Sequence, residues 1–213
     1  MSRVPLARAI DEVAARDPVL ANLVTLAGPL THRPRDPDGH FGMLVRAIVF
    51  QQLAGSAARA IHQRVRATVD GDLTPAALAA VPDVTLRAAG LSASKLASLR
   101  DLSAKVLDGN VNLARLSRRT DEEVITRLVT VRGIGRWTSE MFLLFELRRL
   151  DVWPVDDLGV RRGYGLAWGV DPPPLAKELV ALGERFRPYR SIVARYCWEA
   201  VALFRGGTDP SLR

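Results

Sequence analysis

The chain has 213 residues, 48% of them hydrophobic, so it can bury a substantial core, and nothing in its composition suggests disorder. Thirty basic residues against 23 acidic ones give a net charge of +7, which suits a partner with a phosphate backbone or an anionic surface. No apolar run is long enough to span a bilayer, and no leader or lipidation signal is present. We therefore expect a soluble protein inside the cell, with no membrane partner.

Cysteine and histidine usage excludes several kinds of site. The single cysteine, Cys197, rules out an internal disulfide and any four-cysteine iron–sulfur or zinc site. The three histidines, at positions 32, 40 and 62, are too scattered to indicate a metal site. The sequence predicts no histidine chemistry.

Apolar residues recur at helical spacing along nearly the whole chain, and strand-like alternation is almost absent. The segment Leu30 to His40 should join an N-terminal segment to the main bundle, Pro172–Pro174 should open the penultimate helix, and Gly206-Gly207 should end the last one. The pattern predicts an all-α protein, for which two helical lobes with a groove between them would be a natural design. The expected helices cover residues 6–25, 40–53, 56–69, 74–80, 83–89, 92–107, 120–131, 136–149, 157–168, 173–185 and 188–205.

The segment Leu128 to Thr138 has the pattern of a hairpin between two helices. Gly133 and Gly135 bracket Ile134, so the backbone can turn through positive φ and approach a ligand without a Cβ in the way. A helical pattern follows Gly135, and the unpaired N–H groups of its first turn would attract an anion such as a DNA phosphate. The alternative is an ordinary helix–helix corner in which the glycines only make the turn.

An acidic pair follows the hairpin by about twenty residues, in Trp153-Pro-Val-Asp-Asp-Leu-Gly. A phosphate clamp combined with one acid suggests an enzyme that separates a base from its sugar. The alternative is that Asp156 or Asp157 only caps the helix that begins at Leu158, and we expect Asp156 to be the cap. Arg190 could contact phosphate or brace the loop of the acids, and both roles stay open.

Two further features do not fit a simple core pattern. Gln51 and Gln52 interrupt an otherwise apolar helical stretch, which suggests either a hydrogen-bonded turn or a functional loop. Trp198 projects from nearly the opposite side of the last helix to its apolar stripe. It could therefore pack on a neighbouring lobe or line a pocket.

These motifs together resemble the DNA-3-methyladenine glycosylase II (alkylation repair) family of the helix-hairpin-helix DNA glycosylase superfamily, in a compact form. The similarity runs from about Asp17 to Gly206 and implies one all-α glycosylase domain over residues 1–213, in two lobes with the active site in the cleft between them. It rests on Phe41-Gly-Met-Leu-Val-Arg-Ala-Ile-Val-Phe-Gln-Gln-Leu-Ala, Ala89-Gly-Leu-Ser-Ala-Ser-Lys, the hairpin at about 128–138, Pro154-Val-Asp-Asp-Leu-Gly, and Arg187-Pro-Tyr-Arg-Ser ending in Trp198.

The resemblance implies that Asp157 is the catalytic carboxylate, since it is the second acid of the pair. Cleavage of an N-glycosidic bond builds positive charge on the sugar, which a nearby carboxylate stabilises. Relatives that also nick the strand carry a nucleophilic lysine where this chain has Trp137. We therefore expect a monofunctional enzyme that excises alkylated purines of the 3-methyladenine and 7-methylguanine type, uses water, and leaves an abasic site in base excision repair.

The resemblance also assigns the remaining parts of the site. An aromatic wall would hold a cationic purine by cation–π stacking. A residue at the end of a helix would fill the gap left by the extruded nucleotide; Gln52 is the first choice for this wedge and Leu53 the second. The implied base pocket comprises Trp137, Trp198, Met141, Leu158 and Tyr189, and the implied DNA contacts are Gly133, Ile134, Gly135, Arg136, Thr138, Gln52 and Leu53.

No cofactor and no iron–sulfur cluster is expected, but the resemblance implies Na⁺ or K⁺ held by the backbone carbonyls of Val129, Val131 and Ile134. The expected partner is double-stranded DNA with a damaged base, bound by a monomer that would be cytoplasmic and nucleoid-associated in a prokaryote. Two alternatives stay open. One is a glycosylase for deaminated, etheno or oxidised purines, and the other is a non-catalytic helix-hairpin-helix DNA-binding module.

Overall fold

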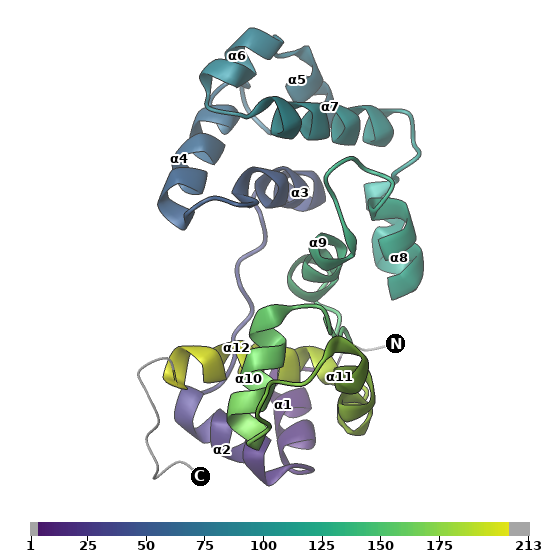
Figure 1. Ribbon diagram of the computed structural model, residues 1–213. Helices are drawn as coiled ribbons and strands as arrows, with labels where there is room; N and C mark the ends of the chain where they lie inside the picture. Colours follow the sequence, from purple (N-terminus) through teal and green to yellow (C-terminus); the bar gives the residue numbers. More distant parts are fainter. Residues whose placement is uncertain (1–3, 205–213) are drawn as a thin grey trace. The chain divides into compact units, whose positions relative to one another are not determined.

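The computed structural model describes residues 4–204, which form helices and loops without a strand (Figure 1). The all-α prediction is therefore confirmed for these residues. None of the described helices is long and apolar enough to cross a membrane.

The chain divides into two compact units. The terminal unit combines the residues up to Arg33 with those from Arg148 onward, and the central unit is Pro34–Leu147. The terminal unit holds α1 (Leu6–Ala14), α2 (Pro18–Ala27), α10 (Leu158–Trp168), α11 (Ala176–Gly183), the 3₁₀ turn η3 (Glu184–Phe186) and α12 (Arg190–Phe204). The central unit holds α3 (Gly39–Phe50), α4 (Gly55–Arg66), α5 (Pro75–Ala80), α6 (Asp83–Ala88), α7 (Ala93–Leu107), the 3₁₀ helix η1 (Leu113–Arg118), α8 (Asp121–Leu128), α9 (Arg136–Met141) and the π-helical turn η2 (Phe142–Glu146).

Each unit has its own apolar core. In the terminal unit α12 packs against α10 and α2, and in the central unit α3 and α5 pack against α7. The buried side chains follow the helical spacing read from the sequence, because one face of each helix must leave water. They include Val13, Leu20, Val160, Tyr164, Ile192 and Tyr196 in the terminal unit, and Leu44, Ile48, Leu99, Leu102, Leu128 and Phe142 in the central unit.

Several expected helix boundaries were wrong. The stretch 6–25 is two helices, because Asp17 caps the Leu20 amide with its side chain and Pro18 occupies the first turn of α2. The penultimate helix begins at Ala176, beyond the three prolines, where Glu178 accepts the amide of Leu175. Pattern reading also missed η1, and Gly206-Gly207 lie outside the described residues.

The helix expected over 136–149 ends earlier and changes its winding. α9 stops at Met141, and the chain continues as the π turn η2 to Glu146. Glu146 is buried and its carboxylate lies 2.8 Å from Nδ1 of His40, at the start of α3. Arg148 then adopts φ = 54°, which a helix does not allow. The apolar pattern continues past Met141, but the α-helical backbone hydrogen bonding changes there to the wider π-helical kind.

Candidate active site

The loop that carries the acidic pair is held in place by two side chains of α12 and by a backbone carbonyl of α11. Arg190 donates to both carboxylate oxygens of Asp151, at 2.7 and 3.0 Å, and to its carbonyl at 3.1 Å. The hydroxyl of Ser191 accepts the Val152 amide at 2.8 Å, and the Trp153 indole donates to the Leu179 carbonyl at 2.8 Å. Arg190 therefore braces the loop of the acids, which answers the question left open by the sequence.

Asp157 both caps a helix and contacts an aromatic side chain. It is the N-cap of α10, and its Oδ1 accepts the Val160 amide at 2.8 Å. The same oxygen accepts the Trp198 indole N–H at 2.9 Å. Asp157 is only 9% exposed, whereas Asp156 is exposed in the preceding turn. The expectation that Asp156 is the cap was wrong, because its side chain lies one residue too early to reach the first turn.

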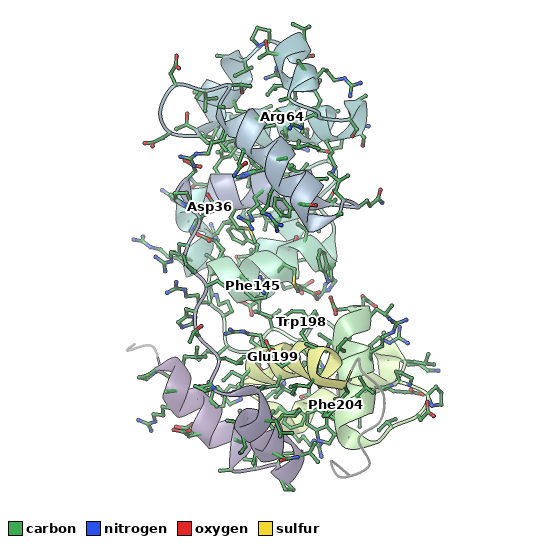
Figure 2. The ribbon with its side chains drawn as sticks, turned by 90° about the vertical axis from the view of Figure 1, so that its left-hand side faces the viewer. Asp36, Arg64, Phe145, Trp198, Glu199 and Phe204 are labelled. Atoms are coloured by element: carbon green, nitrogen blue, oxygen red, sulfur yellow. The ribbon has the colours of Figure 1, made fainter. Side chains whose placement is uncertain are left out.

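Two glycines of α10 allow Trp198 to reach Asp157. Figure 2 shows Trp198 on α12, the helix that packs against α10. A Cβ at Gly163 would overlap the carbonyl oxygen of Cys197, and a Cβ at Gly159 would lie 2.7 Å from Trp198 Cδ1 and 3.0 Å from Asp157 Oδ1. Only glycine at both positions permits this close approach. The four-residue spacing of Gly159 and Gly163 is the sequence signal that could have predicted this close helix contact.

Cys197 lies near this acid, but its environment does not make the thiol reactive. It is completely buried. Burial, and to a lesser extent the charge of Asp157, raises the pKa of its thiol far above the usual range. The thiol is therefore protonated at neutral pH, and Asp157 is the ionisable group of interest here.

The structure places the other four expected pocket residues in different settings. Leu158 follows Asp157 directly and is 51% exposed. Tyr189 is buried, and its hydroxyl donates to Glu12 of α1 at 2.6 Å. In the central unit Trp137 is 48% exposed and Met141 is buried, on the first and last turns of α9. Their roles toward a base stay predictions.

The hairpin has the expected anchor but not two equivalent glycines. Ile134 is buried, and its amide donates to the Val131 carbonyl at 3.0 Å. Gly133 has φ = 78°, and a Cβ there would lie 2.6 Å from the Ser98 hydroxyl. Gly135 has φ = −98°, and a Cβ there would meet nothing within 4 Å. The expectation of positive φ is therefore confirmed for Gly133 and wrong for Gly135.

The other expected hairpin contacts are already engaged within the central unit. Arg136 donates to Glu122 through both terminal nitrogens at 3.1 Å and through Nε to Glu140 at 3.2 Å. The hydrogen bonds to Glu122 are the main reason that the pKa of Arg136 is raised. Thr138 is buried. A phosphate would therefore compete with Glu122 for Arg136, and Thr138 is not exposed to a ligand.

The expected wedge residues lie in the tight loop between α3 and α4. α3 ends at Phe50 rather than 53, and Gln52 adopts φ = 56°, a left-handed conformation that is unusual for a residue with a side chain. Gln52 and Leu53 are both exposed. Gln51 instead turns inward and donates from Nε2 to the Gly133 carbonyl at 2.8 Å. The interpretation as a hydrogen-bonded turn is thus correct for Gln51, while Gln52 and Leu53 extend into solvent.

The carbonyls of Val129, Val131 and Ile134 have the chemistry that a hard monovalent cation prefers. All three are neutral backbone oxygens within six residues of chain. The Val131 carbonyl already accepts the Ile134 amide, but a carbonyl oxygen has a second lone pair for an ion. No group of three or more acidic, histidine or cysteine side chains able to hold a metal is found among residues 4–204. A cation at this place would therefore depend on backbone oxygens.

Comparison with known proteins supports the resemblance of the motifs. A family model described as "HhH-GPD superfamily base excision DNA repair protein" matches residues 45–188. DNA-3-methyladenine glycosylase 1 of Schizosaccharomyces pombe is 35% identical over 163 residues, which cover 75% of this chain and 72% of the relative. The crystal structure of a DNA-3-methyladenine glycosidase from Bacillus halodurans matches with a TM-score of 0.84 and 35% identity, over 92% of this chain and 90% of that one.

A solved complex adds DNA to the comparison. The S. pombe 3-methyladenine DNA glycosylase Mag1, in complex with abasic DNA, matches with a TM-score of 0.80 and 32% identity, over 94% of this chain and all of that one. The family model covers more than half of the present chain, and the helical fold agrees with these solved structures. The chain therefore belongs to the HhH-GPD superfamily of base excision DNA repair proteins and groups there with the DNA-3-methyladenine glycosylases.

Proposed function

We propose that this protein is a monofunctional DNA glycosylase that excises alkylated purines, of the 3-methyladenine and 7-methylguanine type, from double-stranded DNA. The observation that carries the proposal is the buried carboxylate of Asp157, which is fixed by Val160 and the Trp198 indole on a braced loop. The names of the relatives point to the same class of lesion.

The proposed role of Asp157 is electrostatic stabilisation of the positively charged sugar. As the glycosidic bond lengthens, positive charge develops on the sugar, and a fixed carboxylate stabilises the transition state more than the ground state. Because two donors hold Oδ1, little reorganisation of the carboxylate is needed during the reaction. Alkylated purines already carry positive charge and leave readily, so a strong general acid is not required. Water then attacks the anomeric carbon.

The proposed pocket combines aromatic and apolar side chains. Trp198 is half-buried and oriented by Asp157, so its indole face could stack on a cationic purine for roughly 0.5–2 kcal/mol. In the terminal unit, Leu158 and Tyr189 are proposed to contact the base as well, and in the central unit the proposed base contacts are Trp137 and Met141. Trp137 occupies the position where lyase members of the superfamily place lysine, so we infer that the protein forms no Schiff base and does not nick the strand.

Gly135 supports a close approach of DNA to the hairpin. Its backbone angles can be adopted by any residue, and a side chain at this position would not clash with any other part of the protein. Glycine is a favoured residue at the start of a helix, and we propose that it also lets a partner from outside approach, such as a DNA phosphate received by the amides of Gly133, Gly135 and neighbouring residues. We propose that Na⁺ or K⁺ on Val129, Val131 and Ile134 helps to orient these amides, and that Gln52 or Leu53 fills the gap left in the duplex.

The same fold could act on deaminated, etheno or oxidised purines, or bind DNA without catalysis. The test is release of free base from duplexes that each carry one lesion, under single-turnover conditions, with borohydride trapping to detect a Schiff base. We expect release of 3-methyladenine and 7-methylguanine and no trapped complex. Preferred release of another purine would show that the protein acts on that lesion instead. A trapped complex would show that the protein is a lyase, and binding without release would show that it is a DNA-binding module. Light scattering of the protein–DNA complex tests the proposed monomer.

A further inference from the structure

One side of α7 contacts both central-unit segments that we propose to touch DNA. Lys95, Ser98, Asp101 and Lys105 follow one another at intervals of three or four residues, so they share one side of the helix. We call these residues the α7 polar row. In Figure 1 α7 lies across α3 and the hairpin loop between α8 and α9. The row thus meets the end of α3 and the hairpin.

Asp101 and Lys105 hold the first arm of the hairpin. The Asp101 carboxylate accepts the Arg132 amide at 2.7 Å and the Lys105 ammonium at 2.8 Å. The ammonium also donates to the Thr130 carbonyl. These backbone groups lie just beyond α8, where a helix end leaves carbonyls without intrahelical partners. An ion pair from another helix therefore fixes the path of the chain into Gly133.

The Asp101 carboxylate of this pair is charged at neutral pH. Burial acts to raise the pKa of Asp101, but the hydrogen bonds from Lys105 and the Arg132 amide outweigh it, so the pKa is lowered. The contribution of a lowered acid pKa to stability is present above the unfolded value, near 3.8, and is lost only as the pH falls through the folded value. The Asp101 carboxylate is therefore charged throughout the range in which DNA binding is measured.

The tip of the hairpin is tied to the loop of Gln52. The Ser98 hydroxyl packs against Gly133 so closely that only glycine fits there. The Gly133 carbonyl accepts Nε2 of Gln51 at 2.8 Å. Lys95 donates to the Val49 carbonyl at 2.6 Å, two residues before Gln51. Ser98 and Lys95 of α7 therefore contact the hairpin and the end of α3, which are the two segments that Gln51 connects.

The use of lysine here is specific. The chain has 30 basic residues, but Lys95, Lys105 and Lys177 are its only lysines, and two of the three belong to the α7 polar row. A lysine ammonium is a compact point charge, and that of Lys105 serves the Asp101 carboxylate and the Thr130 carbonyl together, whereas the guanidinium of arginine is a larger planar fork. The composition of the chain favours arginine, so these two lysines indicate positions where the shape of the donor matters.

We propose that the α7 polar row and Gln51 position the hairpin and the Gln52–Leu53 loop as one DNA-reading surface. The spacing between the two segments would then match the distance from the gripped phosphate to the gap left by the extruded nucleotide. Asp101, Lys105 and Gln51 act as positioning residues through the hairpin and the loop. This inference rests on the proposed function for the identity of both segments.

The first test compares Lys105→Met with Lys177→Met, which removes the same charge from an exposed position on α11. Binding to an undamaged duplex is measured by fluorescence anisotropy over a series of salt concentrations. We expect Lys105→Met to bind about tenfold more weakly with an unchanged salt slope, and Lys177→Met to bind like the wild type. A slope reduced by about one would make Lys105 a direct phosphate contact. That result, or affinity within about twofold of the control, would overturn the proposal.

Asp101→Asn provides a second variant if Lys105→Met does not fold. Its readouts are duplex affinity and hydrogen exchange of the Arg132 amide by NMR. Loss of the charged acceptor should speed exchange of this amide and weaken binding by a similar factor to Lys105→Met, while the amides of α10 in the terminal unit stay protected. Faster exchange with unchanged affinity would show that the pair is only structural and would contradict the proposal.

A double-mutant cycle with Gln51→Leu and Lys105→Met tests the coupling itself. Single-turnover excision is measured with saturating enzyme. If the hairpin and loop act as one surface, the double variant should lose less than the product of the two single losses. A loss equal to that product would mean that the segments act independently. Should wild type release no base, the proposed function fails, while the binding and exchange experiments still decide whether α7 positions the hairpin.

Discussion

The two hairpin glycines should respond in opposite ways to replacement by alanine. Gly133→Ala forces a side chain into φ = 78° and places its Cβ 2.6 Å from the Ser98 hydroxyl. The left-handed backbone alone costs about 1–2 kcal/mol. Gly135→Ala meets neither problem, and the reduced freedom of its unfolded chain offsets the weaker helix cap. We expect its stability to stay within about 0.5 kcal/mol of wild type.

Thermal unfolding followed by circular dichroism measures the first half of this prediction. At about 2–4 °C per kcal/mol for a protein of this size, Gly133→Ala should lower the midpoint by about 2–8 °C, and Gly135→Ala should leave it almost unchanged. Duplex affinity measures the second half. Gly135→Ala should bind several-fold more weakly although it is as stable as wild type, because the new methyl group faces the approaching backbone of DNA. Gly135→Ala with full affinity would refute the hairpin argument.

The remaining predictions concern both units. Gly163→Ala should unfold the terminal unit or destabilise it by more than about 3 kcal/mol, since the methyl group meets the backbone of Cys197; a denaturation curve close to wild type would contradict the packing argument. Trp198→Phe keeps an aromatic ring but removes the donor to Asp157, so single-turnover excision should slow about tenfold; an unchanged rate would limit Trp198 to stacking. Burial lowers the pKa of His62, so the folded protein binds this proton less readily than the unfolded chain and loses stability as the pH falls below about 6.5. Urea unfolding at pH 7.5 and 5.5 should show a smaller loss for His62→Gln than for wild type, and equal losses would exclude this role.

The parts of the site that depend on local sequence were predictable. Gly133, Ile134 and the helices on either side of them carry their signal within ten residues, and the turn was correctly located. The break at Asp17-Pro18 was just as local, yet the continuous apolar pattern concealed it. The two adjacent acids were harder to separate: either could cap α10 by residue type, and only the position of its first turn shows that Asp157 does so.

The parts that depend on distant contacts could not be predicted from one sequence. Arg190 pairs with Asp151, which lies 39 residues away, so its role could not be chosen in advance. Lys105 and Thr130 are ordinary residues in the sequence and become meaningful only when α7 packs beside the hairpin. The exception is the pair Gly159 and Gly163, whose spacing could have suggested a close helix contact before the structure was known.

The central claim is that the Asp157 carboxylate stabilises the sugar as its damaged purine leaves. The most direct test is the single-turnover rate of 3-methyladenine release by Asp157→Asn, with Asp156→Asn, the exposed acid next to it, as the matched control. The amide can still accept the Val160 and Trp198 hydrogen bonds, so folding and duplex affinity should be retained. We expect a loss of at least about 100-fold for Asp157→Asn and less than about threefold for the control. A normal rate for Asp157→Asn, or a greater loss for Asp156→Asn, would contradict the account.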